Sequence, residues 1–286
     1  MLSLLLSLGM LISMPTVPDT FLLRVISYNL RFDNPADGPN AWPHRIDRIA
    51  AFVRFFEPDV LGVQEALRSM LDSLQVRLPD YRWVGVGRTD GRNGGEFSAI
   101  FYRTNRLELL ESDTFWLSPT PEVPGSKGWD AAHERICTWA YFRDRRSGQT
   151  FFVFNTHFDH EGSQARLESA RLLHRVIAER ARTAPVLLTG DFNTTENTPP
   201  YQTLTSGGLL HDALYRAENG HYGPRTTWNG FKRLIPDQRI DFIFVSANVR
   251  VLHHAILVDL DEQGRFASDH LPVVADVLLS GRHSRY

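Results

Sequence analysis

The chain has 286 residues, of which 42% are hydrophobic and 11% aromatic, so it can bury a large core as one large domain or two small ones. The formal net charge of −2 excludes a globally basic nucleic-acid coat, although arginines gathered over a cleft would not show in this total. The single cysteine, Cys137, excludes an internal disulfide and a cysteine-ligated metal.

The segment from Met1 to Ile12 is almost wholly apolar and has the length of a signal-peptide core. No lysine or arginine precedes it, no Ala-x-Ala cleavage pattern follows, and it is too short to span a bilayer. We therefore place residues 1–20 outside the fold, as an N-terminal extension or signal segment, and residues 21–280 in one domain. We favour the cytoplasm, with export through this segment as the alternative, and expect no stable membrane insertion.

Apolar strands alternate with helices in the first part of the chain. Two apolar runs have the length of buried strands, and they end in Asn29 and Glu65. Apolar residues recur at helical spacing after each run, and Pro58 stops the first helix. The predicted elements are strand 21–28, helix 46–56, strand 59–65 and helix 67–78.

From Tyr81 the pattern is typical of hairpins, interrupted by a glycine-rich loop at 87–95 and a proline-rich loop at Ser118–Gly128. We expect these two loops to wall in a pocket. Ser163 is the predicted N-cap of a long amphipathic helix. The predicted strands are 82–86, 96–102, 106–116, 134–143 and 150–156, and the last of them leads into His157.

The stretch from Pro185 to Asn193 carries an apolar strand out into a carboxylate and a carboxamide two positions apart. Side chains two apart on an extended segment point the same way, so Asp191 and Asn193 can face one reacting atom while Phe192 turns into the core. Gly190 lets the backbone pass close to a neighbouring segment. The remaining predictions are a small helix at 200–206, an irregular region at 219–237, and strands at 239–246 and 249–258.

About eleven strands and three or four helices predict two packed sheets with helices outside. Six apolar strands end in polar side chains that mix carboxylates, carboxamides and imidazoles, with almost no serine or cysteine nucleophile among them. A metal-assisted hydrolase needs such a set. The residues are Asn29, Glu65, His157, Asp191 with Asn193, Asp241, and Asp269 with His270.

These pieces, in this order over residues 21–279, resemble the endonuclease/exonuclease/phosphatase superfamily. Gly-Asp191-Phe-Asn193 and Ser-Asp269-His270 are strong signals together. Others resemble its bacterial branch of metal-dependent hydrolases: Gly-Glu96-Phe-Ser and Asn-Thr-His157-Phe-Asp-His. The resemblance implies a four-layer α/β sandwich, in which two packed, mainly antiparallel or mixed sheets are flanked by helices, with the site at one edge.

The resemblance also implies roles for these residues. Glu65 would hold a hard cation, Mg²⁺ or alternatively Mn²⁺, and Asn29 and Asp241 would complete or orient its shell. Asp269 would accept a hydrogen bond from His270 and fix its tautomer. Asp191 and Asn193 would align the water and steady the pentacovalent phosphorus, and either Asp191 or His270 would be the base. His157 would donate to a non-bridging oxygen with Glu96 as its support.

Several assignments have alternatives. Arg135 faces either phosphate or a neighbouring carboxylate, Glu96 can equally be a carboxylate at a hairpin edge, and Arg31, Arg88 and Arg92 are expected to be solvated. The interpretation is a Mg²⁺-dependent phosphoesterase that acts as a monomer. Its expected partner is a phosphorylated small molecule or a short diester, with nucleic acid as the alternative. The alternatives are a DNA or RNA nuclease, a phospholipid phosphodiesterase, and a non-catalytic phosphate-binding module.

Overall fold

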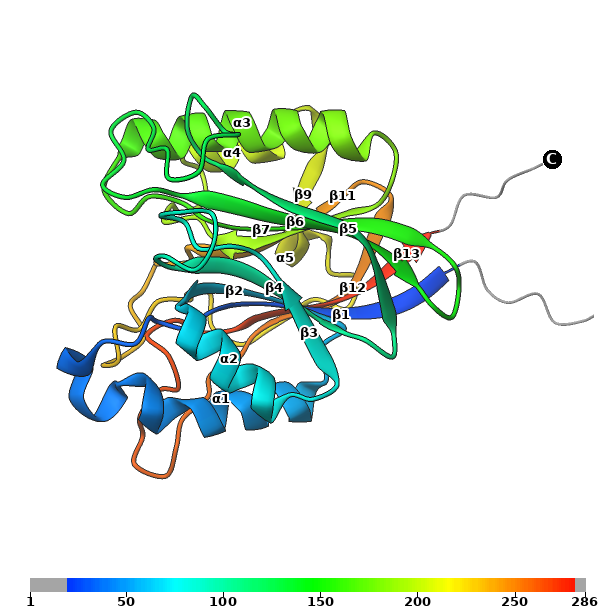
Figure 1. The fold of residues 1–286 in the computed structure, drawn as a ribbon. Helices are drawn as coiled ribbons and strands as arrows, with labels where there is room; N and C mark the ends of the chain where they lie inside the picture. Colours follow the sequence, from blue (N-terminus) through cyan, green and yellow to red (C-terminus); the bar gives the residue numbers. More distant parts are fainter. Residues whose placement is uncertain (1–19, 281–286) are drawn as a thin grey trace, which may run out of the picture.

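The computed structural model describes residues 20–280 as two β-sheets packed face to face, with helices on both outer sides (Figure 1). The seven-stranded sheet contains, in spatial order, β10 (His221–Tyr222), β12 (Val249–Ile256), β13 (Val273–Ser280), β1 (Thr20–Asn29), β2 (Val60–Ala66), β4 (Phe97–Arg103) and β3 (Tyr81–Val84). The six-stranded sheet contains β5 (Leu107–Trp116), β6 (Ile136–Asp144), β7 (Thr150–His157), β8 (Val186–Asp191), β11 (Asp241–Ser246) and β9 (Leu210–Asp212).

The helices complete a four-layer sandwich. The outer face of the seven-stranded sheet is covered by α1 (Trp42–Phe56) and α2 (Arg68–Arg77), and the other sheet by α3 (Ser163–Ala181) and α4 (Pro199–Thr205) (Figure 1). A short helix, α5 (Ala213–Arg216), contacts β11 and β12. The 3₁₀ turns are η1 (Pro35–Asn40) and η2 (Ser206–Gly208). The predicted α/β sandwich of two mixed sheets is confirmed.

Alternation of side chains along the strands builds three apolar layers. In β1, Leu23 and Val25 point between the sheets, whereas Ile26 and Tyr28 point towards α1 and α2. In β8, Leu187 joins the layer between the sheets, and its neighbours on either side pack under α3. Each sheet is thus buried on both faces, which explains why its strands read as nearly continuous apolar runs.

The same alternation carries polar side chains to the space between the sheets. Asp191 of β8 lies directly opposite His157 of β7 on one side and Asp241 of β11 on the other. In the facing sheet, Asn29 at the end of β1 pairs with Gln64 of β2. The strand register therefore gathers the predicted polar strand ends at one edge of the sandwich.

A buried polar layer separates this edge from the apolar core. Asn155 Oδ1 accepts hydrogen bonds from Gln64 Nε2 (2.7 Å) and Thr189 Oγ1 (2.9 Å), which lie in opposite sheets. Its Nδ2 donates to the carbonyls of Val63 and Ala99. A Cβ on Gly62 would lie 2.2 Å from Thr189 Oγ1 and 2.7 Å from Asn155 Oδ1, so a glycine is required there.

Most predicted elements are present, with differences at their ends. Helix α1 begins at Trp42, four residues before the predicted start, because Pro43 suits the first turn of a helix. Ser163 is the first residue of α3 and makes no side-chain cap; Asp130 instead accepts from the amides of Gln164 and Ala165. The described residues form thirteen strands, more than predicted, because β9 and β10 are very short.

The predictions for residues 1–19 lie outside the described part of the chain. Among residues 20–280, no helix has the length and apolarity that crossing a bilayer requires.

Candidate active site

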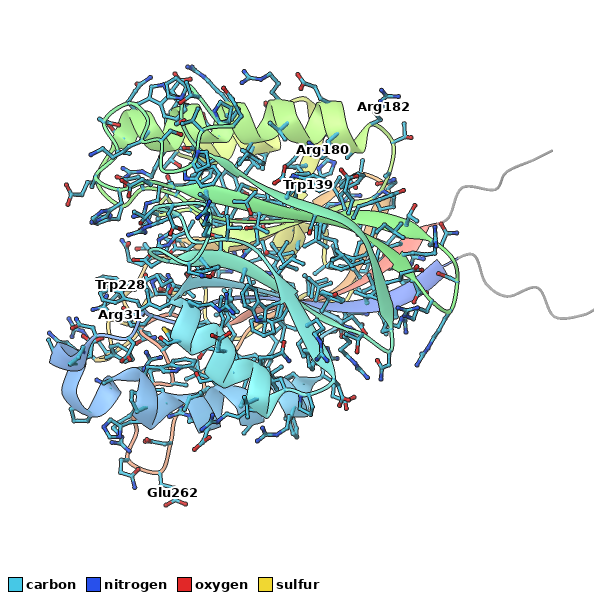
Figure 2. All side chains as sticks on the ribbon, viewed as in Figure 1. Arg31, Trp139, Arg180, Arg182, Trp228 and Glu262 are labelled. Atoms are coloured by element: carbon cyan, nitrogen blue, oxygen red, sulfur yellow. The ribbon has the colours of Figure 1, made fainter. Side chains whose placement is uncertain are left out.

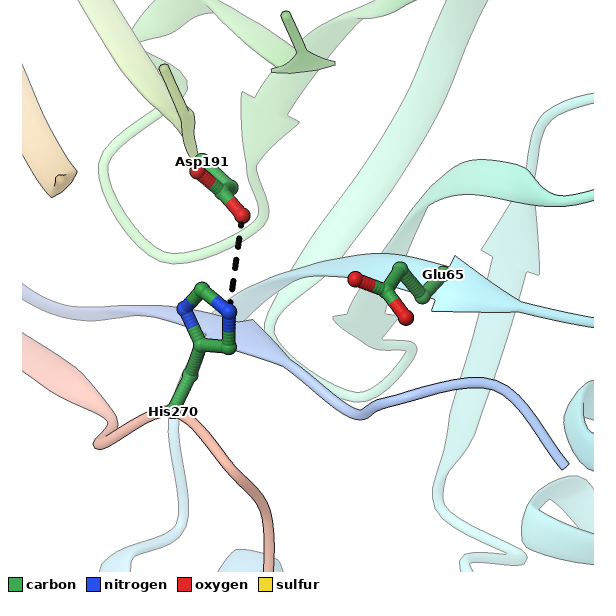
Figure 3. A group of neighbouring side chains, drawn as sticks. All are labelled: Glu65, Asp191 and His270. Carbon is green, nitrogen blue, oxygen red and sulfur yellow. Dashed lines mark ion pairs between the residues drawn. The ribbon is translucent and has the colours of Figure 1, made fainter. Parts of the chain in front are cut away.

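The polar strand ends line a cavity of about 510 Å³ at the edge of the sandwich. Glu65, Asp191 and His270 approach one another there from three separate elements (Figure 3). Arg31 and Trp228 also line this cavity, on the side of the molecule where the loops gather (Figure 2). The cavity is also lined by Phe32, Arg88, Glu96, His133, Arg135, His157, His160, Asn193, Gln238, Ile240 and Asp269.

Asn29 orients two carboxylates. Its Nδ2 donates to Glu65 Oε1 and Asp191 Oδ2, both at 2.9 Å, while its Oδ1 accepts from the backbone amide of Arg31. Because that backbone group can only donate, it fixes which end of the amide faces the carboxylates. Both ends of Asn29 are engaged, so it holds the two carboxylates in fixed positions.

A break in the strand directs Glu65 into the cavity. Strict alternation would put Glu65 on the opposite face from Gln64, but the pairing of β2 with β4 shifts register between Val63 and Ala66, and Glu65 has a φ of 60°. Bulges of this kind re-aim a side chain next to a functional site. Glu65 Oε2 also accepts from the amide of Phe32 at 3.1 Å.

The partner of His270 is Asp241, which corrects the predicted pairing with Asp269. His270 Nδ1 lies 2.8 Å from Asp241 Oδ2, and Nε2 faces Asp191 Oδ2 at 3.7 Å. Burial alone would lower the pKa of His270, but the carboxylates of Asp241, Asp191 and Asp269 hold that pKa well above its usual value. Asp241 therefore lies behind His270, accepts from its Nδ1 and does not line the cavity.

Asp269 lines the cavity beside Arg31. Its carboxylate lies 3.9 Å from Arg31 Nε and 3.4 Å from Ser268 Oγ. Burial first, and then the charge of Glu65, raise the pKa of Asp269. The sequence neighbour of His270 is thus a member of the carboxylate cluster and not the group that holds the imidazole.

Asp191, Asn193 and His157 form one hydrogen-bonded group. Asp191 Oδ1 accepts from the amide of Asn193 at 2.9 Å, and Asn193 Nδ2 lies 3.0 Å from both His157 Nε2 and the carbonyl of Phe158. Because burial holds the pKa of His157 well below its usual value, its ring is neutral and Nε2 accepts from Asn193. The two residues of the Asp-Phe-Asn stretch thus face one imidazole, while Phe192 is fully buried.

Glu96 lies beside His157 but has a shorter contact elsewhere. Its Oε2 is 3.9 Å from His157 Nδ1 and 2.7 Å from Arg88 Nη1. Arg135 Nε donates to Asp159 at 3.2 Å, so of the two predicted partners, a phosphate or a neighbouring carboxylate, the carboxylate is present. Arg135 also lines the cavity.

Some cavity residues were not identified from the sequence. Arg31 and Arg88 line the cavity although they were expected to be solvated. Arg45 was missed because it falls within an amphipathic helix; its buried guanidinium donates to the carbonyls of Leu30, Arg31 and Ala267 and joins the two loops that carry the site.

The proline-rich loop does not line this cavity. Pro121, Glu122 and Pro124 instead line a separate groove beside α3.

The donor set fits a hard divalent cation. Ligand atoms of Glu65, Asp191 and His270 all lie within 4.8 Å of one another. Burial first, and then the charge of Asp241, raise the pKa of Asp191. Burial first, and then the charge of Glu65, likewise raise the pKa of Glu96. A divalent cation would offset this crowding of negative charge, and Mg²⁺ prefers carboxylate oxygens and water as ligands. Glu65 and Asp191 are the carboxylates placed to hold it.

The fold is the deoxyribonuclease I-like α/β sandwich, with a carboxylate and imidazole site at the edge of its paired sheets. Residues 26–270 match the sequence model of the Endonuclease/Exonuclease/phosphatase family, and the chain belongs to this family. Members of the family hydrolyse phosphate esters.

Solved structures and curated relatives agree with this assignment. The endonuclease/exonuclease/phosphatase from Bacteroides vulgatus is 40% identical, with a TM-score of 0.86, covering 90% of this chain and 98% of that chain. The mannosyl-6-phosphatase of Bacteroides thetaiotaomicron is 38% identical, with a TM-score of 0.84, covering 89% of this chain and 99% of that one. Drosophila melanogaster nocturnin is 31% identical over 278 residues, which cover 82% of this chain but 42% of nocturnin.

Proposed function

We propose that this chain hydrolyses the phosphate ester of a small phosphorylated molecule, with a sugar phosphate as the first candidate, in a reaction that requires Mg²⁺ or Mn²⁺. The observation that carries the proposal is the meeting of Glu65, Asp191 and His270 in a cavity of about 510 Å³, a size typical of small-molecule sites. The 38% identity to a mannosyl-6-phosphatase supports a sugar phosphate.

The proposed chemistry is attack of water on phosphorus, in which the P–O bond to the alcohol breaks and the alcohol leaves with a proton. A cation held by Glu65 and Asp191 would polarise a phosphoryl oxygen when bound. His270 exchanges a proton with water or the phosphoryl group at Nε2, since Nδ1 is engaged by Asp241. His157, whose Nε2 accepts from Asn193, keeps its proton on Nδ1 and donates from there.

The pairing of the cavity arginines favours a small ester over nucleic acid. Arg31, Arg88 and Arg135 do gather at the cavity, but each contacts a carboxylate: Asp37 at 2.9 Å, Glu96 at 2.7 Å and Asp159 at 3.2 Å, respectively. A nucleic-acid groove gains most of its affinity from unpaired cations that neutralise successive phosphates. Here each of the three arginines is already paired with a carboxylate, so a long polyanion gains little from neutralising successive phosphates.

A substrate panel tests the proposal. Phosphate release would be measured on hexose 6-phosphates and nucleotide monophosphates, and cleavage would be measured on bis-p-nitrophenyl phosphate, single-stranded oligonucleotides and plasmid DNA. We expect a hexose phosphate to give the highest kcat/KM. Plasmid or oligonucleotide cleavage that exceeds every small ester, and falls steeply as salt rises, would replace the proposal with the nuclease alternative.

A further inference from the structure

Arg135 has one guanidinium nitrogen without an acceptor. The residue is 5% exposed, its Nε donates to Asp159 Oδ2 at 3.2 Å, and its Nη2 lies 3.0 Å from His160 Nδ1. Nη1 is buried and has no hydrogen-bond partner among residues 20–280. Since arginine stays protonated, this N–H group is a desolvated donor, and an acceptor supplied by a ligand would stabilise it.

Asp159 holds Arg135 in a fixed position. Burial alone would raise the pKa of Asp159, but hydrogen bonds from backbone amides and the charge of Arg135 hold that pKa below its usual range. The guanidinium therefore has little freedom to turn elsewhere for a partner. The amides that donate to Asp159 are those of Ala132, His133, Glu161 and Gly162.

The imidazole of His160 lies beside Arg135. Because a guanidinium only donates, His160 Nδ1 must accept from Arg135 Nη2, and the proton of His160 lies on Nε2. This ring stacks on His133 with centroids 5.6 Å apart and an interplanar angle of 13°. Both rings line the cavity together with Arg88 and Arg135. We call these four residues, Arg88, His133, Arg135 and His160, the basic wall.

We propose that the basic wall is an oxyanion subsite, in which Arg135 Nη1 donates to a phosphate or carboxylate oxygen of the substrate. The wall is within reach of the hydrolytic centre, since Arg88 and Arg135 line a small cavity together with His157. An anionic acceptor suits it because hydrogen bonds between two charged groups are about twice as strong as neutral ones. The subsite rests on the proposed function for its substrate, and the oxyanion is either the scissile phosphate or a second acidic group.

Binding of inorganic phosphate tests the subsite without turnover. Titration calorimetry with the Mg²⁺-loaded protein would compare the wild type with Arg135→Gln, Arg135→Lys and the pair Arg135→Gln with Asp159→Asn. The double variant leaves no unpaired carboxylate buried, so it guards against misfolding caused by a lone Asp159. Arg135→Lys keeps the positive charge but loses Nη1, so an effect on binding can be separated from an effect on folding. Arg250→Gln is the matched control, because Arg250 forms an exposed pair with Glu218.

We expect the Kd for phosphate to rise by roughly 10-fold or more in each Arg135 variant, as for a lost hydrogen bond to a charged group, with no change in Arg250→Gln. Comparing kcat/KM on a hexose 6-phosphate and a hexose 1,6-bisphosphate identifies the source. Equal losses indicate the scissile phosphate, and a larger loss on the bisphosphate indicates a second acidic group.

An unchanged Kd in folded Arg135 variants would overturn the subsite and leave Nη1 to a bound water. Arginine-dependent phosphate binding without hydrolysis of any ester would instead overturn the proposed function and keep the subsite.

Discussion

His270 Nδ1 lies 2.8 Å from the carboxylate of Asp241, a residue 29 positions earlier in the chain. Asp269, the adjacent carboxylate in sequence, faces Arg31. The reason is the position of the backbone: the carbonyl of Asp269 accepts from the amides of Asn229 and Gly230, which fixes this loop beside the start of β11. The backbone amide of Asp241 in turn donates to Thr227 Oγ1 at 3.1 Å, which fixes the position of Asp241.

The first prediction concerns this pair. Asp241→Asn should lower kcat by roughly 10²–10⁴, the range for a lost acid–base contribution, because His270 then loses the acceptor that fixes its tautomer. His270→Ala should cause a similar loss, and the double variant little more, since the two side chains act as a unit. Asp269→Asn is the comparison and should lower kcat less. Steady-state kinetics check this, and single losses that multiply in the double variant would show that the residues act independently.

The second prediction concerns Asn29. Removing its amide in Asn29→Ala frees Glu65 and Asp191 to separate, so the Mg²⁺ concentration for half-maximal activity should rise by about 10- to 100-fold, as for other groups that orient metal ligands. Asn219→Ala, at an exposed position, is the control. Activity would be followed in a Mg²⁺ titration of the metal-stripped protein. A lower kcat at an unchanged Mg²⁺ requirement would remove the orienting role.

The third prediction concerns the polar layer under the site. A methyl group at Gly62 would lie 2.2 Å from Thr189 Oγ1, so Gly62→Ala should lower the free energy of unfolding by about 1–3 kcal/mol. Thr189→Ala in the same chain removes that contact and should restore part of the loss. Urea unfolding of the two single variants and the double variant gives the coupling. Simple addition of the two losses would mean that the methyl group is accommodated elsewhere.

The fourth prediction concerns the pH dependence of stability. The pKa of His254 is lowered to about 3, mainly by burial and then by the charges of His221, Arg239 and Arg225. Its ordinary value in the unfolded chain is 6.5, so between pH 6.5 and 3 the unfolded state takes up a proton that the folded state does not. The free energy of unfolding should therefore fall as pH drops, by about 2 kcal/mol between pH 6.5 and 5.

Urea unfolding at pH 7 and pH 5 checks this prediction. His254→Gln should show a smaller fall than the wild type, and His44→Gln, at an exposed position on α1, should show the same fall as the wild type. Equal falls in all three proteins would mean that His254 does not remain neutral in the folded state.

The sandwich could be predicted because its strands are short apolar runs bounded by turn residues. The polar residues meet at one edge because Asp191 ends β8 and Asp241 begins β11, which runs antiparallel to it. The sequence predicted that Asp191 and Asn193 face one reacting atom; in the structure both side chains approach the imidazole of His157. The pairing of His270 could not be predicted, since Asp241 comes into contact only through the register of β11 and β8. Adjacency in sequence pointed to Asp269 instead.

The grouping of the basic wall could not be predicted from the sequence either. Arg88 and Arg135 are 47 positions apart in the sequence, and no local pattern of residues indicates that both line the cavity. Buried Arg45 shows the same limit, because a charged residue on an amphipathic helix is normally taken to face solvent. Only the packing of α1 against the loop carbonyls reveals its contacts.

The most direct test of the account is phosphate release from a hexose 6-phosphate by the metal-stripped protein as Mg²⁺ is added back. The carboxylate cluster around Glu65 and Asp191 predicts no turnover after exhaustive chelation, recovery with Mg²⁺ or Mn²⁺, and a strongly raised Mg²⁺ requirement in Glu65→Gln. Full turnover of the chelated wild-type protein would contradict the account.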